Sequence, residues 1–466
     1  MAAEALPFQH SRAFRLRRFL NWFPMGLTYA FLYMGRYNLT VSKNALGDLM
    51  TNEDFGIIFA VGTFTYALAF LINGPLTDKL GGKKAILFGA LGSGLMNLIM
   101  GLTIRSMLLT GHEANLRLVF SFLYAANMYF QSFGAVAIVK VNASWFHVRE
   151  RGIFGGIFGI LISLGVYFAF DWGYGIVEAT RATLDSHLGF LQVIIRHITG
   201  ATNATIDETW WVFIVPTVLL WAMFLIEVFL LRDKPSEAGF EDFDTADASS
   251  GAMDEKFHLF DVLKKILTNP IILTIAAIEF CSGVMRNGIM HWYPIYIKSA
   301  LHYGPDHFMR EHWGLILMLA GVSGGMFAGW LSDHVFGSRR GPVAALLYGL
   351  MLAGAITMVF TLKSPWYVLG AVVGFMSLSV IGVHGMLSGT STMDFGGRKA
   401  AATAVGLIDG FVYLGTAVQS ISLGFLTTAN WNYWPPFLIP FAVIGLVLAI
   451  KIWHAYPQPA KKVEGH

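Results

Sequence analysis

Gly74-Pro75-Leu76-Thr77-Asp78-Lys79-Leu80-Gly81-Gly82-Lys83-Lys84 is a short charged turn between two long apolar stretches. A degenerate copy, Gly329-Trp330-Leu331-Ser332-Asp333, lies in the second half of the chain and is followed by Arg339-Arg340. The spacing from Gly to Asp is the same in both copies. A second repeat occurs at the same offset, as Lys43-Asn44-Ala45-Leu46 and Lys298-Ser299-Ala300-Leu301. These repeats predict two halves that fold alike and follow one another in parallel.

The composition indicates a chain that is buried in lipid. Of its 466 residues, 55% are hydrophobic and 13% are charged, whereas a soluble chain carries about 25% charged residues. A membrane-spanning helix needs about 20 predominantly apolar residues. Twelve stretches meet this condition, at residues 20–42, 55–76, 85–104, 117–140, 152–171, 209–231, 270–297, 312–331, 341–361, 366–388, 401–427 and 433–453.

Basic residues gather in alternate connections between these stretches, and this asymmetry predicts the orientation. Connections rich in Lys and Arg remain cytoplasmic, so we expect both termini in the cytoplasm and the chain in a bacterial inner membrane. A helical pattern at 186–198 predicts an amphipathic helix on the outer membrane surface. The expected organisation is a cytoplasmic segment 1–19, a six-helix bundle 20–232, a cytoplasmic linker 233–269, a second six-helix bundle 270–453 and a cytoplasmic tail 454–466.

Several classes of function are excluded by the composition and motifs. A formal net charge of +3 is too small to indicate a nucleic-acid partner. The single cysteine, Cys281, rules out an intramolecular disulfide and a cysteine-based metal cluster. The sequence has no recognisable nucleophilic triad, Walker sequence or metal-ligand cluster, so we expect no enzyme activity, no cofactor and no metal. The expected partners are a small anionic substrate and membrane lipid, and the protein is expected to be a monomer.

Two arginines lie inside predicted spans, Arg36 in the first and Arg286 in the corresponding span of the second half. A charge at membrane depth costs roughly 2.5–3.5 kcal/mol on insertion scales. The guanidinium group of an arginine presents a planar fork of hydrogen-bond donors, which suits a carboxylate or a phosphate. The pair therefore predicts an anion site between the two halves. The alternative is that each arginine snorkels or pairs with a carbonyl or carboxylate of a neighbouring helix.

The turn at Gly74–Lys84 resembles the signature loop of the major facilitator superfamily. A closer resemblance is to its organophosphate:phosphate antiporter family, which includes glycerol-3-phosphate and hexose-6-phosphate transporters. The similar segments are Tyr29-x3-Tyr33-x2-Arg36-Tyr37-Asn38, Tyr66, Phe130-Gln131-x2-Gly134-x5-Lys140, Arg286-Asn287-Gly288-x3-Trp292-Tyr293-Pro294 and Tyr413-Leu414-Gly415.

The resemblance implies an all-α membrane protein, with twelve transmembrane helices in two pseudo-symmetric six-helix bundles. It implies a secondary active transporter of an organic anion, a phosphorylated metabolite, by alternating access, with exchange for inorganic phosphate as one mode. The expected substrate-binding residues are Arg36, Arg286, Tyr29, Tyr33, Tyr66, Tyr413, His291 and Asn38. The expected gating motif consists of Gly74, Asp78, Lys83, Lys84, Asp333 and Arg339.

Three positions depart from the family pattern. Phe70 stands where the family has a lysine near its site, and Ile160 to Ser163 replaces a region with a histidine. His291 stands where the family has an acid. The paired arginines remain while the rest of the polar site has changed. An anionic substrate is therefore still expected, whereas a simple sugar phosphate and phosphate exchange itself stay open.

Two further acids could couple transport to protons, and their roles are open. Asp409 either carries a proton or pairs with an arginine. Glu279 lies about two helical turns before Arg286 and either neutralises it or faces a neighbouring helix. His291 either titrates near neutral pH or forms a hydrogen bond in a polar cavity. Alternative functions are proton-coupled anion symport through Asp409 or His291, a non-transporting sugar-phosphate sensor of the same fold, and a lipid or drug exporter.

Overall fold

The computed structural model describes residues 10–111, 115–147, 150–184, 187–243, 245, 268–337, 339–387 and 401–454, without the side chains of residues 151–158 and 401–405. These residues form helices and turns and contain no strand. Eleven of their helices are long and apolar enough to cross a membrane. Most of the predicted linker, 246–267, and the end of the predicted tail, 455–466, lie outside the described residues.

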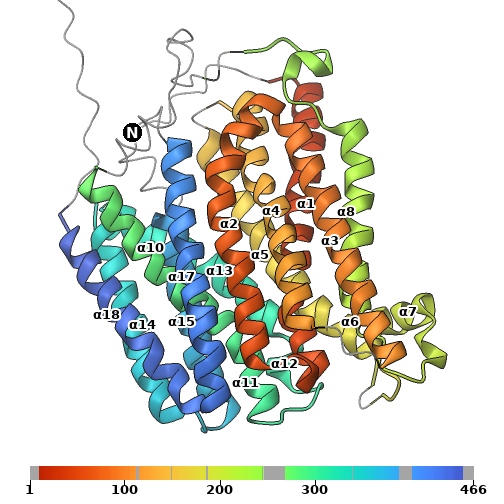
Figure 1. Ribbon diagram of the computed structural model, residues 1–466. Helices are drawn as coiled ribbons and strands as arrows, with labels where there is room; N and C mark the ends of the chain where they lie inside the picture. The colour runs from red at the N-terminus through yellow and green to blue at the C-terminus, as the bar shows by residue number, and fades with distance from the viewer. Residues whose placement is uncertain are drawn as a thin grey trace, which may run out of the picture.

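The two halves of the chain form two helix bundles that stand side by side, drawn in warm and cool colours (Figure 1). The first bundle contains α1 (Arg12–Leu46), α2 (Asn52–Leu80), α3 (Gly82–Thr110), α4 (Leu116–Trp145), α5 (Arg151–Tyr167), α6 (Gly173–Ala179), α7 (Phe190–Thr199) and α8 (Trp211–Leu230). The second contains α10 (Pro270–Met290), α11 (Trp292–Ser299), α12 (Phe308–Glu311), α13 (Trp313–Trp330), α14 (Arg340–Thr361), α15 (Trp366–His384), α17 (Ala401–Ala429) and α18 (Trp434–Lys451).

Helix α1 supplies the twelfth span. At 35 residues it is long enough, but it is not among the eleven apolar candidates. Polar side chains such as Arg36 and Asn38 lower its hydropathy, and they are buried because α1 lies against α4, α5 and α8 inside the first bundle. The predicted fold, with twelve spans in two six-helix bundles, is confirmed.

Several helices extend beyond the predicted spans, and in the fifth the extension includes a change of helix type. The fifth was expected to end at residue 171, but α5 continues through a π-helical turn, Phe168–Trp172, into α6 and ends at Ala179. Buried contacts support this extension, since the Asn44 amide donates to the Tyr174 hydroxyl at 2.6 Å. The expected amphipathic helix is present as α7. Its position on the outer membrane surface stays a prediction, which the exposed side chains of Phe190 and Ile198 favour.

We call the end of the bundle where α1 begins and α18 ends the terminal side, and the opposite end, with α7 and α12, the loop side (Figure 1). The halves meet most closely where α2 crosses α17 on the loop side. Gly56 and Gly424 form this crossing, and a Cβ added to Gly56 would lie 2.4 Å from the Ser420 carbonyl oxygen. Small residues permit such close approach of helices in lipid.

Polar contacts between the halves also gather on the loop side. The Asp171 carboxylate accepts hydrogen bonds from the backbone N–H groups of Gly314, at 2.6 Å, and Leu315, at 3.1 Å, at the start of α13. The Lys298 ammonium donates to the Asn44 carbonyl, so the two copies of the second repeat contact each other. The Asn52 amide donates to the Thr427 hydroxyl at 3.1 Å. These contacts hold the loop side closed.

On the terminal side, the beginning of the linker is fastened to the first bundle. The Asp233 carboxylate accepts a hydrogen bond from the backbone N–H of Lys83 at 2.7 Å and so caps α3. Arg18 pairs with Glu150 at 2.9 Å. Burial opposes ionisation of Glu150, but the hydrogen bonds and charge of Arg18 outweigh it and lower the pKa of Glu150. The first bundle therefore moves as a unit with the start of the linker.

The crossing of α2 and α17 makes a prediction about the loop side. Gly56→Leu inserts a side chain where a Cβ alone would contact backbone, so it should push the two helices apart. Spin labels at the exposed positions Leu49 and Asn430, introduced after Cys281 is replaced, should report a longer mean distance in this variant. Gly325→Leu is the control, because nothing lies within 4 Å of a Cβ at Gly325. Identical distance distributions in all three proteins would contradict the assignment of this crossing as the loop-side closure.

Candidate functional site

Arg36 lies fully buried in α1 and uses each of its nitrogens in a hydrogen bond. Its Nε donates to Gln131 Oε1 on α4 at 2.8 Å. Its Nη1 donates to the Tyr413 hydroxyl on α17 at 2.9 Å, and its Nη2 donates to the Tyr66 hydroxyl on α2 at 3.0 Å. The guanidinium thus joins three helices, one of which belongs to the other half.

Aromatic rings surround the same guanidinium. Its central carbon lies 4.6 Å from the Tyr33 ring centroid and 4.5 Å from that of Tyr66. The Tyr413 ring contacts the Tyr66 ring in a tilted arrangement, with centroids 4.4 Å apart, and it lies 5.9 Å from Arg36. We call the rings of Tyr33, Tyr66 and Tyr413 the aromatic box. The faces of aromatic rings attract a cation, so the aromatic box compensates part of the hydration that Arg36 loses on burial. Among the described residues, no carboxylate pairs with Arg36, and the positive charge therefore remains available to an anion.

A network of buried amides holds the turn of α1 that carries Arg36. The Gly35 carbonyl accepts from Asn97 on α3 at 3.1 Å and from Asn127 on α4 at 3.0 Å. The Gln131 amide nitrogen donates to Asn127 at 3.2 Å. Fully satisfied polar networks of this kind rigidify a core. Gln131 lies in a segment that carries the family resemblance, but it was not predicted as a site residue.

Arg286 on α10 is the second predicted arginine, and its environment differs from that of Arg36. Its Nε is buried and has no hydrogen-bond partner in the part of the chain that the structure describes. Its charge interacts with the hydroxyls of Tyr37 and Tyr413, and the rings of these two tyrosines lie 6.0 and 5.9 Å from Arg36. The next residue, Asn287, donates to the Thr416 hydroxyl at 2.8 Å and fixes α10 against α17. One arginine is thus saturated by the protein, and the other is not.

His291 lies between the halves, at the break between α10 and α11. Its Nδ1 is 2.7 Å from the Thr40 hydroxyl on α1, and its Nε2 is buried without a partner. The rings of Tyr37 and Phe59 lie 4.7 and 4.5 Å from it. Of the two roles left open by the sequence, the geometry shows the hydrogen bond, and it places His291 on the loop side of Arg286.

Two other predicted binding residues have different surroundings. Tyr29 is buried and packs edge-on against Tyr33, with centroids 5.4 Å apart, so it lies against the aromatic box. Asn38 donates to Asn97 at 2.7 Å and to the Val212 carbonyl at 3.3 Å. Its amide is therefore used in packing α1 against α3 and α8. Phe70 closes the box on the terminal side of Tyr66, with centroids 4.6 Å apart.

The two candidate coupling acids lie on neighbouring helices of the second bundle. Asp409 is half-buried on α17, one helical turn before Tyr413. Glu279 is fully buried on α10, and its hydrogen-bonded neighbour is His384 on α15, at 2.9 Å. Glu279 therefore contacts a neighbouring helix, as one of its two expected roles requires, and its neutralisation of the Arg286 charge stays a prediction. His384 was not predicted, although a histidine inside the apolar stretch 366–388 is a signal that could have found it.

The predicted gating residues form ion pairs and caps on the terminal side. Asp78 pairs with Lys140 on α4 at 2.7 Å, and Asp333 pairs with Arg340 at 3.2 Å. Lys83 donates to the Val228 carbonyl at 2.7 Å, and Arg339 donates to the Phe336 carbonyl at 3.0 Å. Lys84 is exposed. Among the described residues, no atom lies within 4 Å of a Cβ at Gly74, so its place in the gating motif stays a prediction.

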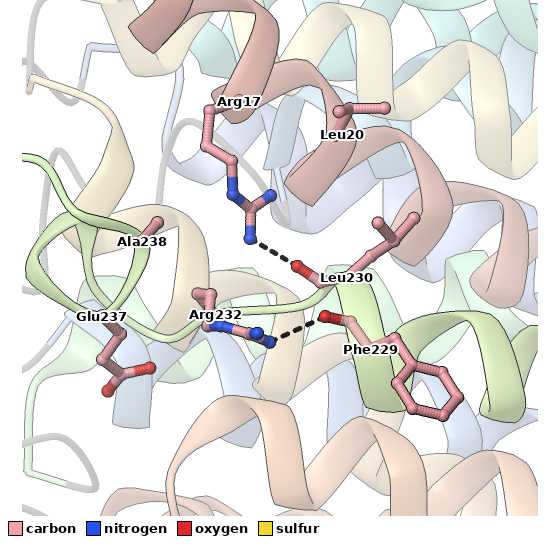
Figure 2. A pocket seen from close by; sticks show the side chains of 7 residues that line it. All are labelled: Arg17, Leu20, Phe229, Leu230, Arg232, Glu237 and Ala238. Atoms are coloured by element: carbon pink, nitrogen blue, oxygen red, sulfur yellow. Dashed lines mark hydrogen bonds between the residues drawn. The ribbon is translucent and has the colours of Figure 1, made fainter.

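A separate pocket of about 360 Å³ lies at the terminal end of α1 and α8 (Figure 2). Arg17 donates to the Leu230 carbonyl, and Arg232 donates to the Phe229 carbonyl at 2.9 Å. These arginines satisfy carbonyls at the end of α8 that have no partner within the helix. The pocket contains none of the predicted binding residues. It is lined by Arg17, Leu20, Phe229, Leu230, Arg232, Glu237 and Ala238.

Gln131 provides a test of the site that does not alter either arginine. Gln131→Leu leaves Arg36 Nε without its acceptor, and a hydrogen bond to a charged group contributes roughly 1.5–3 kcal/mol. We therefore expect anion binding to weaken roughly ten- to a hundredfold, because the fork is no longer oriented. Gln131→Glu should weaken binding further, since it neutralises the guanidinium. Gln192→Leu on α7 is the control. Unchanged titration calorimetry with inorganic phosphate in both Gln131 variants would show that Arg36 needs no orientation by α4.

Comparison with known proteins agrees with this architecture. Residues 25–420 match the profile of the Major Facilitator Superfamily. A crystal structure of a bacterial homologue of the human lysosomal transporter Spinster, in an inward-facing and unoccupied conformation, is similar with a TM-score of 0.69. The two sequences are 12% identical, and the match covers 95% of this chain and 97% of the other. This likeness shows the shared fold.

Curated relatives span nearly the whole chain at low identity. A glycerol-3-phosphate transporter of Bacillus subtilis is 24% identical and covers 94% of this chain and 92% of its own. A probable hexose phosphate transport protein of Chlamydia pneumoniae is 23% identical, with 95% and 91% covered. The membrane sensor protein UhpC of Salmonella typhimurium is 22% identical, with 91% and 88% covered. These relatives confirm the resemblance to the organophosphate:phosphate antiporter family. With the profile match and the two six-helix bundles, they show that the chain belongs to the Major Facilitator Superfamily.

Proposed function

We propose that the protein transports a phosphorylated metabolite by alternating access, and that Arg36 and Arg286 bind the phosphate group. One observation carries the proposal. Two arginines from opposite halves interact with Tyr413 of the aromatic box, and one of them has a buried nitrogen with no partner among the described residues. A buried unsatisfied donor is unfavourable, so an anion that supplies the acceptor gains free energy when it binds. The relatives named as glycerol-3-phosphate and hexose phosphate transporters support a phosphate ester as that anion.

The substrate phosphate would meet a prepared set of donors. Arg286 offers its free Nε, and Arg36 exchanges the neutral hydroxyls of Tyr66 and Tyr413 for phosphate oxygens. Charge-assisted hydrogen bonds are roughly twice as strong as neutral ones, so this exchange is favourable. The hydrogen bond from Arg36 Nε to Gln131 maintains the orientation of the guanidinium during the exchange. The displaced tyrosine hydroxyls remain beside the phosphate and can donate to it.

Substrate binding would also change the contact between the halves. The Arg36–Tyr413 hydrogen bond joins α1 to α17, and phosphate competes directly for that donor. A ligand shifts a conformational equilibrium only by its differential affinity for the two states. Replacing a bond between the halves by a shared phosphate provides such a difference. The loop-side contacts of Asp171, Asn52 and Lys298 would then break and re-form as the halves rock.

The second candidate is a sensor of phosphorylated metabolites, because one relative of similar coverage is named a membrane sensor protein. The same arginine pair would bind the ligand, so binding alone does not separate the two functions. Counterflow separates them. A transporter exchanges labelled substrate across the membrane, whereas a sensor binds it and moves little.

Arg36→Lys and Arg286→Lys test the phosphate site. Lysine retains the charge but loses the planar fork, so we expect phosphate exchange to fall at least a hundredfold in each, with near-normal expression. The assay is exchange of labelled inorganic phosphate against internal glycerol 3-phosphate or glucose 6-phosphate in proteoliposomes. Arg105→Lys is the matched control, since Arg105 lies over the Trp210 ring, away from the aromatic box. Wild-type exchange in both site variants would refute the role of the arginine pair.

We propose that the terminal side faces the cytoplasm, because short connections rich in Lys and Arg remain there. Single cysteines at Glu237 and at Gln192, introduced after Cys281 is replaced, test this in sealed cells. An impermeant thiol reagent added outside should label the Gln192 position, in α7, and should label the Glu237 position only after the cells are permeabilised. The reverse pattern would invert the topology.

A further inference from the structure

A buried acid and a histidine form a pair in the second bundle that the phosphate site does not use. The Glu279 side chain is completely buried, and its Oε2 lies 2.9 Å from His384 Nδ1. Its other oxygen, Oε1, is buried without a hydrogen-bond partner. The His384 side chain is 22% exposed and lies in the last turn of α15, on the terminal side. One partner is therefore sealed in the bundle, and the other reaches its surface.

The pair lies between the terminal side and the phosphate site. Glu279 is nine residues from the first residue of α10, and Arg286 is seven residues further along the same helix. At 1.5 Å per residue, Glu279 is about 13 Å from the helix start and Arg286 about 10 Å beyond it. Seven residues are close to two full turns, so both side chains leave α10 on the same face. The Glu279 charge consequently acts on Arg286.

The other titratable groups around Glu279 come from its own helix and from the helices packed on it. Cys281 lies on α10, and Tyr348 lies on α14, where its hydroxyl donates to the Ile278 carbonyl at 2.6 Å. On α17, the Tyr413 hydroxyl interacts electrostatically with Arg286, as Glu279 does, and the carboxyl of Asp409 lies one helical turn before Tyr413. The thiol and the two phenols are neutral near pH 7. Arg286 keeps its charge, so its attraction for an anion depends on the charge of the nearby pair.

A purely structural ion pair is the simpler interpretation, and the geometry argues against it. A buried ion pair is favourable only when further hydrogen bonds satisfy its remaining lone pairs, yet Glu279 Oε1 has none. Glu227 in the first bundle offers a direct comparison. It is also fully buried, accepts a hydrogen bond from Thr28 at 2.7 Å and has one oxygen without a partner. Glu227 lacks a histidine, whereas Glu279 has a second proton acceptor within hydrogen-bond distance.

We propose that Glu279 and His384 form a proton-binding site that couples proton movement to transport of the phosphorylated anion, and this rests on the proposed function. The pair holds one proton between His384 Nδ1 and Glu279 Oε2. With the proton bound, the pair is neutral overall, and Arg286 presents its full charge to the substrate. Without it, a bare carboxylate offsets the Arg286 charge, and anion binding weakens. While the loop side is closed, the proton is taken up from water through His384. After the halves rock, it is released on the other side of the membrane together with the anion.

The strength of the coupling follows from the distance. Two unit charges about 10 Å apart at an effective dielectric constant of about 20 change a binding constant roughly tenfold. Linkage makes the effect reciprocal, so anion binding favours protonation of the pair by the same factor. Proton and anion then bind together and move together. Neither Asp409 nor His291 is needed as the proton carrier in this scheme.

Glu279→Gln provides the decisive variant, because glutamine mimics the proton-bound carboxyl. At pH 8, we expect it to bind inorganic phosphate roughly tenfold more tightly than the wild type in titration calorimetry. In proteoliposomes that contain glycerol 3-phosphate, it should keep counterflow within about twofold. It should lose the stimulation of phosphate uptake by an imposed pH gradient. A residue that only stabilises the bundle would instead weaken binding and counterflow together.

Two further variants complete the experiment. Glu227→Gln is the matched control and should retain both wild-type affinity at pH 8 and the response to the gradient. His384→Gln removes one proton acceptor and leaves the carboxylate, so it should shift the pH at which phosphate affinity changes. Phosphate exchange in the wild type that ignores the pH gradient would overturn the coupling site and leave the proposed function intact. The same conclusion would follow if Glu279→Gln changed neither the phosphate affinity nor the response of phosphate uptake to the pH gradient. A wild-type protein that neither binds nor moves either phosphate probe would overturn both proposals.

Discussion

The structure depends on keeping a guanidinium ion at membrane depth. Arg36 cannot lose its proton, and lipid offers it no hydration, so the protein must supply acceptors and polarisable surfaces around it. Gln131, Tyr66 and Tyr413 supply the acceptors, and the tyrosine rings supply the surface. The acceptors are neutral, so the positive charge is solvated and not cancelled. A carboxylate in the same place would have stabilised the helix and removed the attraction for an anion.

The buried amides follow from the same constraint. A fork of donors recognises phosphate only if its orientation is maintained, and a flexible arginine would lose that advantage. Asn97 and Asn127 hold the Gly35 carbonyl, so the turn before Arg36 is tied to α3 and α4. The first bundle is therefore rigid around its arginine. The second bundle leaves Arg286 Nε unsatisfied and places a titratable pair two turns away. In the proposed mechanism, one half would hold the ligand geometry, and the other half would respond to ligand and proton.

The contacts between the halves show how such a site can alternate. The loop side is closed by a helix crossing that needs glycine and by individual hydrogen bonds from Asp171, Asn52 and Lys298. Each of these hydrogen bonds contributes a modest free energy. A change in one central interaction between the halves can therefore break them together. The hydrogen bond between Arg36 and Tyr413 is central and joins the halves directly. Substrate chemistry and conformational change therefore share the same atoms.

Much of the fold could be predicted from the sequence because lipid imposes a simple rule on composition. Each span must be apolar for about 20 residues, and the repeated turns at Gly74–Lys84 and Gly329–Arg340 predict two similar halves. The two arginines also stood out, since a charge at membrane depth is rare without a function. The end of the fifth span was misplaced because the polar residues after position 171, such as Glu178, are buried by contacts with other helices. Hydropathy does not register such contacts.

By itself, the sequence determined the spans, their parallel repeat and the presence of two membrane-depth cations. The tertiary structure decided which polar side chains meet. Asn38 is close to Arg36 in the sequence, and Gln131 is close to it in space, and either amide could bind a substrate. In the structure, Asn38 donates to Asn97 on α3, whereas Gln131 accepts a hydrogen bond from the Arg36 guanidinium. Glu279 and His384 are more than a hundred residues apart in the chain and contact each other only because α10 packs on α15. Helix periodicity specifies which face of a helix a residue occupies. The partner on that face depends on the packing of all twelve helices, which no local pattern encodes.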